Sequence, residues 1–372
     1  MDLKKKVIDY AKTIGVDLIG FTNAEAFEDI RQVLEERKRL GHLSGFEEKD
    51  IELRIDPKKT MPNAQSIIVI AISYYRNTPK EVIQDNVKFK GELSRTAWGL
   101  DYHHVLKDKL EKIAQFIKED KKDLEYKSFV DTGPLLDRHV GYRAGLGWYG
   151  YNSLLINEEY GSWIFIGYML TNIIFEQDKP LVDNKCYGCN LCVLNCPKGA
   201  IGEAYKFNAT KCISNILQQK ADIPERDREI LGKNLYGCDI CQNVCPHNKK
   251  VRETTEDLFQ PKEVSHTPGL IELLNMSNKD FKESYKKTSA GWRGKKTLQR
   301  NAIIAIVNHR DKGAIPHLLS LIKDPRSEIR RYALWGITKL DPSYAYNILM
   351  DAKKYEKDAE VLQSIDKYLK GL

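Results

Sequence analysis

The stretch Cys186-Tyr-Gly-Cys189-Asn-Leu-Cys192-Val-Leu-Asn-Cys196-Pro197 holds four of the chain's eight cysteines. Two residues separate each of the first three cysteines, three residues separate the third from the fourth, and a proline follows. This spacing is typical of bacterial proteins that bind [4Fe–4S] clusters, in which three thiolates bind one cube and the fourth turns to a neighbouring cube. It disfavours a structural zinc site, which usually takes its ligands from two separated pairs.

The other four cysteines repeat most of this pattern. Cys238, Cys241 and Cys245 are spaced like the last three cysteines of the first run, and a proline again follows, but the first position has moved upstream to Cys212. If the last thiolate of each run crosses to the other cube, every cysteine is used. The first cluster would then be held by Cys186, Cys189, Cys192 and Cys245, and the second by Cys212, Cys238, Cys241 and Cys196. The sequence therefore predicts two [4Fe–4S] clusters and a protein that transfers electrons.

The cysteine runs occupy only the middle of the chain, with about 180 residues before them and about 120 after them. Before them, Ser66–Ser73 is a continuous β-branched run typical of a buried strand, and residues 4–14 and 102–117 have helical spacing. After residue 251, a polar connector leads to successive amphipathic helices with Asp-Pro breaks, a pattern typical of HEAT-type repeats. An ordinary helical bundle is the alternative for this last part. A pure electron carrier needs neither flank, so the clusters are expected to serve another site.

Positive charge is concentrated in the C-terminal part. Between Tyr285 and Arg331 there are 12 Lys and Arg against three acidic residues, a net charge of about +9, whereas the whole chain has a formal net charge of +7. A localised basic face indicates a polyanionic partner, although a charged run can also be a solvated face. Trp292 could stack on a base, and the residues that could grip RNA phosphates are Arg293, Lys295, Lys296, Arg300, Arg310, Arg326, Arg330 and Arg331.

No membrane or export segment is predicted. The longest charge-free apolar run, Gly161–Phe175, is shorter than the ~20 residues that a membrane helix needs, and the first ten residues are too charged for a signal peptide. We therefore expect a cytoplasmic protein, in which cysteines serve as metal ligands or catalysts more often than as disulfides. No heptad pattern demands a partner copy, so a monomer is expected.

Further stretches along nearly the whole chain carry a resemblance to one family. They are RIDP at 54–57, SRTAWGLDYH at 94–103, VDTGPLLDR at 130–138, RAGLG at 143–147, NS at 152–153, CIS at 212–214, LYGCD at 235–239 and GWRGKK at 291–296. With the cysteine runs, they resemble the epoxyqueuosine reductases, cobalamin-dependent enzymes that reduce epoxyqueuosine to queuosine in tRNA. Thr96 departs from the family, which often has an aromatic residue there, and this could weaken a substrate contact.

The resemblance implies an α+β multidomain fold. It would comprise a nitroreductase-like α/β cobalamin-binding core at 1–180, a ferredoxin-like module with two [4Fe–4S] clusters at 181–250, a connector at 251–285 and an α-helical HEAT-like domain that contacts tRNA at 286–372. Electrons would pass through the clusters to cobalamin, which would have no protein histidine on its cobalt. The chain lacks the Asp-x-His-x-x-Gly motif of histidine-ligated corrins.

The resemblance also implies the catalytic residue. Asp131 matches the family's proton donor, and a donor must be protonated when it acts. From the residues alone, a turn or N-cap role before the helix expected at Leu135 is the favoured interpretation of Asp131, and the resemblance reverses that preference. The adjacent His103 and His104 face different directions on a helix, so we predict no metal site there.

The residues expected to contact cobalamin are Arg54, Asp131, Asn152, Ser153, Ser214, Lys220 and Asp239. The alternatives are a surface salt bridge for Arg54 and plain turn chemistry for Asn152 and Ser153. For the last three, the alternative is hydrogen bonds that only shape the segment inserted between Cys212 and Cys238, Ile213–Gly237. The expected partners are tRNA carrying epoxyqueuosine and an external low-potential electron donor. Rival interpretations are a reductive dehalogenase, which usually has a twin-arginine signal and no basic helical tail, and a ferredoxin-type carrier or RNA-binding iron–sulfur protein without catalysis.

Overall fold

The computed structural model describes residues 2–78, 87–203 and 205–372. The chain forms two compact units, each assembled from three segments. The first unit comprises Met1–Pro79, Leu100–Asn215 and Asp239–Gln260, and the second comprises Lys80–Gly99, Ile216–Cys238 and Pro261–Leu372. This division differs from the four consecutive parts expected from the sequence, which stay a prediction.

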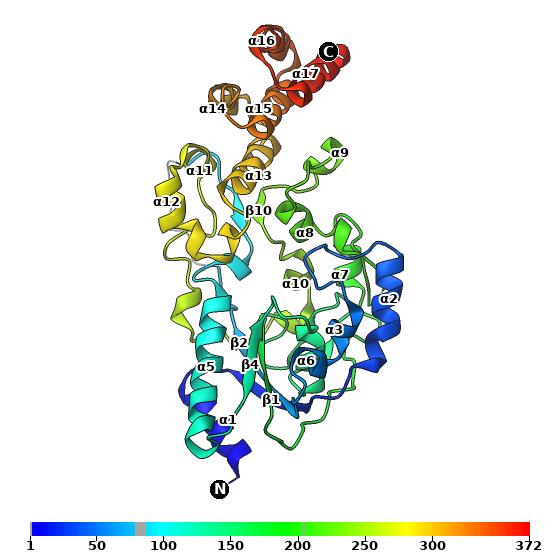
Figure 1. Cartoon of the computed structure of the whole chain (residues 1–372). Coiled ribbons are helices and arrows are strands. Elements are labelled where there is room, and N and C mark those ends of the chain that lie inside the picture. The colour runs from blue at the N-terminus through cyan, green and yellow to red at the C-terminus, as the bar shows by residue number, and fades with distance from the viewer. Residues whose placement is uncertain (1, 79–86, 204) are drawn as a thin grey trace. The chain divides into compact units, whose positions relative to one another are not determined.

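The first unit is built on an antiparallel sheet with the strand order β1-β2-β7-β4 (Figure 1). Its strands are β1 (Leu18–Asn23), β2 (Ser66–Ser73), β4 (Tyr126–Val130) and β7 (Ile164–Thr171). β2 pairs with β7 along its whole length, and every residue of both strands is buried. The strand predicted from the β-branched run is therefore confirmed with the same bounds.

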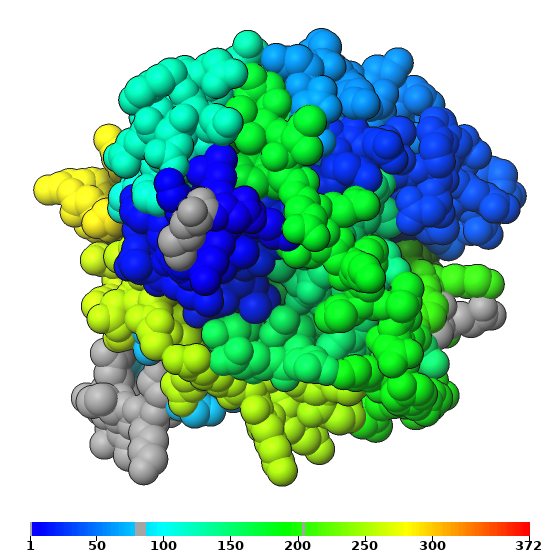
Figure 2. Space-filling view, turned by 90° about the horizontal axis from the view of Figure 1, so that it is seen from below, coloured from blue at the N-terminus to red at the C-terminus, as the bar shows by residue number. Residues whose placement is uncertain are grey.

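Helices cover both faces of this sheet, because alternate residues of a strand point to opposite sides. On one face, Ile68, Ile70 and Ile72 pack against α1 (Leu3–Thr13) and α5 (Tyr102–Asp120). On the other face, the intervening residues of β2 pack against α6 (Asp137–Arg143), with α2 (Arg31–Arg39) and α3 (Ile51–Ile55) nearby. Figure 2 shows α1, in blue, beside the teal segment that contains α5. This layered core fixes the positions of the loops that follow β4 and precede α5.

The cysteine-rich part of the first unit has only short elements. The elements of this part are α7 (Leu191–Leu194), β8 (Ile201–Glu203), β9 (Lys206–Phe207), η3 (Ala209–Lys211), α8 (Ile213–Gln218), α10 (Ile240–Asn243) and η4 (Pro246–Asn248). The first unit also contains η1 (Glu28–Ile30), α4 (Pro57–Thr60), β5 (Trp148–Tyr149), β6 (Leu155–Ile156) and η5 (Asp257–Phe259). α8 ends in the second unit.

Buried hydrogen bonds fasten this part to the core. The Ser162 amide donates to Asn248 Oδ1 (2.8 Å), Asn248 Nδ2 donates to Ser162 Oγ (2.9 Å), and Ser162 Oγ donates to Gln242 Oε1 (2.9 Å). Tyr74, just after β2, donates to the same Gln242 oxygen (3.3 Å). Because all four side chains are buried, the network holds α10 and the loop after Cys245 in a defined place on the core.

The second unit is mostly helical. Its elements are β3 (Glu92–Leu93), η2 (Arg95–Ala97), α9 (Glu225–Arg228), β10 (Asn234–Tyr236), α11 (Leu270–Asn275), α12 (Asn278–Glu283), η6 (Tyr285–Lys287), η7 (Ser289–Gly291), α13 (Lys295–Asn308), η8 (Lys312–Ala314), α14 (Ile315–Leu321), α15 (Ser327–Leu340), α16 (Pro342–Tyr355) and α17 (Ala359–Gly371). Every residue of α13 from Thr297 to Val307 is buried, and α13 contacts α11, α15 and β10. The succession of helices predicted after the connector is thus confirmed, with α13 as its centre (Figure 1).

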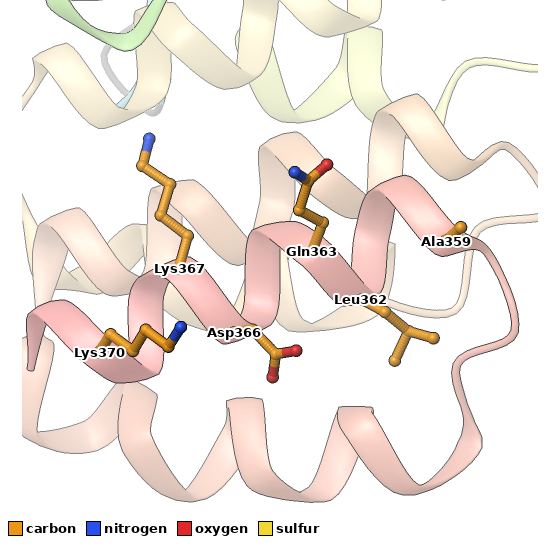
Figure 3. Close-up of a pocket in the computed structure, with 6 residues that line it drawn as sticks. All are labelled: Ala359, Leu362, Gln363, Asp366, Lys367 and Lys370. Carbon is orange, nitrogen blue, oxygen red and sulfur yellow. The ribbon is translucent and has the colours of Figure 1, made fainter.

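A surface hollow of about 740 Å³ follows α17 (Figure 3). It is lined by Ala359, Leu362, Gln363, Asp366, Lys367 and Lys370. All six residues come from a single helix, and none of them is a cysteine or another residue predicted for the site. The hollow is therefore a groove along one helix, and the chemistry lies elsewhere.

Candidate active site

Asp131 lies directly after β4 in a strained turn. Its φ is 55°, in the left-handed region that residues other than glycine seldom adopt. The Thr132 amide donates across it to the Val130 carbonyl (2.5 Å), which closes a three-residue turn. The Asp131 side chain is 66% exposed, and its Oδ2 accepts a hydrogen bond from the Tyr102 hydroxyl (2.9 Å). Strain of this kind often marks a functional site, and here it presents a carboxyl group to solvent.

His103, at the start of α5, stands beside this carboxyl group. Its Nε2 lies 3.8 Å from Asp131 Oδ2, and its Nδ1 lies 2.6 Å from Asp101 Oδ1. Burial alone would lower the pKa of His103, but the hydrogen bond to Asp101 and the charges of Asp101, Asp131 and Asp137 outweigh it and raise the pKa. These acidic neighbours therefore stabilise the protonated form of the His103 imidazole relative to that of an isolated histidine. In the structure, His103 is a polar neighbour of the Asp131 carboxyl group.

Asp137, the first residue of α6, holds the turn from below. Its Oδ2 accepts the backbone N–H of Asp131 (2.7 Å). The residue is partly exposed as a whole, yet its Oδ1 does not touch solvent and accepts no hydrogen bond from any described residue. Burial, and next the charge of Asp131, raise the pKa of Asp137 to about 8. The exposed carboxyl group of Asp131 and the largely shielded carboxyl group of Asp137 thus lie close together.

Two shielded arginines, the buried Arg54 and the half-buried Arg37, lie close to each other. Arg54 is 8% exposed, and burial lowers its pKa, with the neighbouring Arg37 acting in the same direction and Glu47 opposing it. Burial also lowers the pKa of Arg37, as does Arg138, while Glu47 again opposes. The Nε of Arg37 is out of contact with solvent and has no hydrogen-bond partner among the described residues. The guanidinium groups of Arg54 and Arg37 lie near one carboxylate, that of Glu47, and the Arg37 Nε remains a donor that suits an oxygen-rich ligand.

Arg138 connects these features. Its guanidinium donates to the carbonyl of Ser153 (3.1 Å), and its charge acts on Asp137, Arg37 and Cys212. It lies inside a stretch that the sequence analysis matched to the family, but no role was assigned to it. Arg37 was missed because it belongs to a helix so rich in charge that it reads as a solvated surface. The place of Arg37 and Arg138 in the site is visible only from their tertiary contacts.

Asn152 and Ser153 form the turn that Arg138 contacts. Asn152 is 5% exposed, and its Oδ1 accepts the Leu154 amide (3.2 Å), as in plain turn chemistry. Its Nδ2, however, is out of contact with solvent and donates to none of the described residues. Ser153 has a φ of 61°. A buried amide donor without an acceptor among the described residues suits a ligand that carries an acceptor.

Other predicted contacts are placed differently. Ser214 lies beside a cysteine, where its backbone N–H donates to the Cys212 thiol. Asp239 precedes α10, and its charge helps to raise the pKa of the buried Tyr74. Lys220 is exposed and belongs to the second unit. Arg138 therefore contacts Ser153 directly and lies near Asp137 and Arg37, which are the neighbours of Asp131 and Arg54. The cobalamin contacts expected for all seven residues stay predictions.

The first set of cysteines gathers around Cys192. Burial, and then the charges of three neighbouring thiols, raise its pKa to about 11, and these neighbours are Cys186, Cys245 and Cys189. They are the four residues that the crossover rule assigns to the first cluster. Cys245 also packs against Trp148 and Ile156 of the core. All four belong to the first unit.

The second set shows part of the same grouping. Burial raises the pKa of Cys212, the amides of Asn215 and Ser214 lower it, and Cys196 raises it further. Cys196 and Cys212 are therefore neighbours, although 15 residues separate them. Such amide donors to sulfur are common around iron–sulfur clusters and tune their potentials.

Close grouping around a single ion is not seen. In residues 2–78, 87–203 and 205–372, no three His, Cys, Asp or Glu side chains converge as ligands of one metal ion. A zinc site would need four ligands on one ion, with Zn–S bonds of about 2.3 Å. In a [4Fe–4S] cube each thiolate binds a different iron, so the sulfur atoms lie farther apart. The eight free cysteines supply the number of thiolates that two [4Fe–4S] clusters require.

Comparison with known proteins identifies the family. The family described as epoxyqueuosine reductase QueG, DUF1730, matches residues 54–132, and a 4Fe-4S double cluster binding domain matches residues 185–248. The epoxyqueuosine reductase of Bacillus cereus is 42% identical over 371 residues, covering 100% of this chain and 97% of the relative. The chain belongs to the epoxyqueuosine reductase family.

Other epoxyqueuosine reductases agree. The Bacillus subtilis protein is 43% identical over 98% of this chain and 95% of its own length. A crystal structure of an epoxyqueuosine reductase with an epoxyqueuosine-modified tRNA-Tyr stem loop superposes with a TM-score of 0.92 at 42% identity, covering 99% of this chain and 98% of the other. A Bacillus subtilis structure, described as having its catalytic aspartate loop swung out of the active site, gives 0.93 at 42% identity over 100% and 99%.

The helical tail agrees with a repeat architecture in a general way. Residues 310–340 match an Armadillo/beta-catenin-like repeat, which, like HEAT, is built from stacked helices. The mixed helix-and-sheet fold with a double-cluster domain is confirmed, whereas the nitroreductase-like, ferredoxin-like and HEAT-like descriptions of its parts stay predictions. In the described part of the chain, no helix combines the length and the apolar character needed to cross a membrane.

The structure corrects the list of basic residues expected to grip RNA. Arg300 is completely buried, and its guanidinium donates to the carbonyls of Leu217, Gln219 and Ala221 (3.1, 2.8 and 3.0 Å). It therefore braces the chain and does not face a partner, so the expectation for this residue is wrong. Counting charges along a sequence cannot separate a buried arginine from an exposed one.

Four further arginines of that list are engaged in ion pairs, and two of them, Arg310 and Arg331, pair with Glu229 and Asp222. Arg326 pairs with Asp324 (2.8 Å), and Arg330 pairs with Glu356 (2.7 Å). The Arg330 interaction lowers the pKa of Glu356 to about 2. The Arg326 pair and a hydrogen bond from Arg330 to the Asp324 carbonyl (2.8 Å) fix the loop between α14 and α15. The ion pairs leave fewer cations for RNA than the sequence suggested.

Proposed function

We propose that this chain reduces epoxyqueuosine to queuosine in tRNA. The observation that carries the proposal is an identity of 42–43% over essentially the whole chain to reductases named for this reaction. The crystal structure with an epoxyqueuosine-modified stem loop, at a TM-score of 0.92, supports tRNA as the form in which the substrate is presented. The assignment makes the chain an oxidoreductase.

The proposed cofactors are two [4Fe–4S] clusters and cobalamin. The eight free thiols supply ligands for the clusters in the crossover arrangement. Cobalamin carries carboxamide and phosphate oxygens, and unused buried donors at Arg37 Nε and Asn152 Nδ2, beside the buried Arg54, fit acceptors of this kind. When bound, cobalamin supplies a strongly reducing metal for the epoxide. The chain's part is to hold it and to exclude water.

The reaction also needs protons. Converting an epoxide to an alkene consumes two electrons and two protons and releases water, so the departing oxygen must be protonated. We assign one of these protons to Asp131, because its carboxyl group is exposed at the end of β4 and hydrogen-bonded by Tyr102. His103, 3.8 Å away with a raised pKa, is placed to return a proton to that carboxyl group.

We assign tRNA binding to exposed parts of the second unit. Trp292 is 43% exposed, and the Arg293 guanidinium lies over its ring at 4.6 Å. Such a stacked pair offers a platform for a base, and Lys295 and Lys296 follow at the start of α13. The protein would act as a cytoplasmic monomer and take electrons from an external low-potential donor.

A turnover assay tests the proposal. The protein is purified without oxygen, its iron and sulfide are reconstituted, and it is incubated with cobalamin, a strong reductant and tRNA bearing epoxyqueuosine. Digestion and mass analysis of the nucleosides should show the loss of one oxygen, dependent on cobalamin and abolished in Asp131→Asn. If a preparation with both clusters and bound cobalamin gives no conversion, the proposed function is wrong.

A further inference from the structure

The backbone N–H of Asp131, the strained residue of its loop, is held by a side chain, that of Asp137. A three-residue turn with a positive φ at its centre is rare and strained, so surrounding contacts must maintain it. The Asp131 N–H points away from the strand and donates to Asp137 Oδ2 at 2.7 Å. Without this acceptor, the Asp131 amide would have to bond to water. The loop at Asp131 would then no longer be tied to the first residue of α6.

The charges around Asp137 decide its protonation state. The groups that face it are Asp131 from the turn, Arg138 from α6, His103 from α5 and Tyr168 from β7. Arg138, His103 and the Asp131 amide favour the carboxylate, but burial and the charge of Asp131 outweigh them and raise its pKa to about 8. The Oδ1 atom, which has neither water nor a donor among the described residues, is where a carboxylate would be penalised most.

We propose that Asp137 is a positioning residue for the proton donor, whose neutral carboxyl group holds the Asp131 backbone in its left-handed turn. The proposal deepens the proposed function and rests on it for the role of Asp131. A neutral carboxyl group offers its carbonyl oxygen to the Asp131 amide without placing a second negative charge beneath the donor. Ionisation of Asp137 would set two carboxylates side by side and favour departure of the loop.

The consequence is a limit on activity at alkaline pH. The Asp137 pKa is raised, so the neutral form is present at low and neutral pH and is lost as the pH rises through about 8. Turnover should therefore fall above this pH, with the change in kcat and not in the KM for tRNA. The loop of the Bacillus subtilis relative, which is described as swung out of the active site, shows that this segment has a second position in that protein.

Two substitutions distinguish the role of Asp137 as a hydrogen-bond acceptor from the effect of its charge. Asp137→Asn keeps a neutral acceptor of the same shape, whereas Asp137→Ala removes the acceptor. We expect Asp137→Asn to keep turnover at neutral pH and to lose the alkaline fall, and Asp137→Ala to lower kcat by up to about a hundredfold, the size of effect that misplacing a catalytic group produces. Asp108→Asn, an exposed aspartate on α5 paired with Lys112, is the matched control.

Two measurements on the cofactor-loaded protein without turnover complete the test. Infrared spectroscopy should show a neutral-carboxyl band that disappears near pH 8 in the parent protein and is absent from Asp137→Asn. Hydrogen exchange of the peptide that contains Asp131 should accelerate in Asp137→Ala and not in Asp108→Asn. Both results support the proposal without any substrate, so a failure of the queuosine assignment would leave them intact.

Several results would overturn the proposal. One is full kcat and unchanged exchange in Asp137→Ala, and another is an Asp137→Asn protein as inactive as Asp137→Ala. If Asp137→Ala does not fold, the Asn variant decides, because an alkaline fall identical to that of the parent protein excludes Asp137 as its origin. If the parent protein itself gives no queuosine, the proposed function fails, while the infrared and exchange results still decide the role of Asp137.

Discussion

Replacing Arg300 by methionine is expected to loosen one segment of the second unit, residues 216–223. The buried guanidinium donates to three carbonyls of this segment, but the substitution does not leave all of them without a donor. Leu217 O keeps the Asn301 amide (2.9 Å), and Ala221 is exposed, so water can replace the lost contact there. Gln219 O, which is only partly exposed, loses its donor at 2.8 Å.

The free-energy change follows from these contacts. An unsatisfied buried group costs about 1–3 kcal/mol, and breaking a buried charged contact costs about 3–5 kcal/mol when a charge is left behind. Here the substitution leaves no carboxylate unpaired, because Glu328 keeps its ion pair with Lys296 (2.7 Å). Methionine also restores apolar packing and removes a desolvated cation. We therefore expect a loss of about 2–3 kcal/mol, in the upper part of the first range and no higher than the bottom of the second.

Hydrogen exchange followed by mass spectrometry measures this loss locally. A change of about 2–3 kcal/mol corresponds to exchange that is roughly 30- to 140-fold faster, since each 1.4 kcal/mol is a factor of ten. Peptides from residues 216–223 should show it, and peptides from the β2–β7 sheet should not. Arg226→Met, at an exposed arginine of the same unit, should stay within about 0.5 kcal/mol. Equal exchange in the two variants would refute the bracing role.

Three further outcomes can be measured. Cys245→Ser should lower the iron content from about eight to about four per chain, because one of two [4Fe–4S] clusters loses a ligand; an unchanged content would contradict the ligand assignment. Arg293→Ala should weaken tRNA binding and reduce the slope of log affinity against log salt by about one, whereas Lys353→Ala on α16 should leave both unchanged. His103 has a raised pKa, so its contribution to stability is present below its ordinary value of 6.5 and is lost as the pH rises through the raised one. The difference in urea midpoint between the parent protein and His103→Gln should accordingly be largest at acidic pH, and a difference that grows with pH would contradict this reasoning.

Local sequence predicted those parts of the fold whose signal is contained in a single segment. The run from Ser66 to Ser73 has no polar interruption, and it forms β2 with the same bounds. The last helix, α17, lay within the part predicted as helical but was not delimited. Asp358 caps it by accepting the amides of Glu360 and Val361, a signal that was available in the sequence.

The site depended on information that no single segment contains. Asp131 was found through resemblance to a family, whereas its anchor Asp137 lies in the same matched stretch and remained unnoticed. Its importance comes from burial and from the neighbouring charge, which depend on α5, α6 and β7 packing around it. Arg300 shows the opposite error, since its charge suggested a surface that the fold does not give it.

The chain changes from one unit to the other five times between its ends. Tandem domains fold in turn as they leave the ribosome, but neither unit here can follow that order. The first unit is incomplete until residue 260 has been synthesised, and the second unit waits for residues near 372 to join a segment made before residue 100. A fragment cut at residue 180 would lack α10 and its hydrogen bonds to Tyr74 and Ser162. Deleting the helical tail would likewise leave the segment from Ile216 to Cys238 without α13 to pack against, so truncation is a poor way to separate the RNA binding and the electron transfer that we propose for this chain.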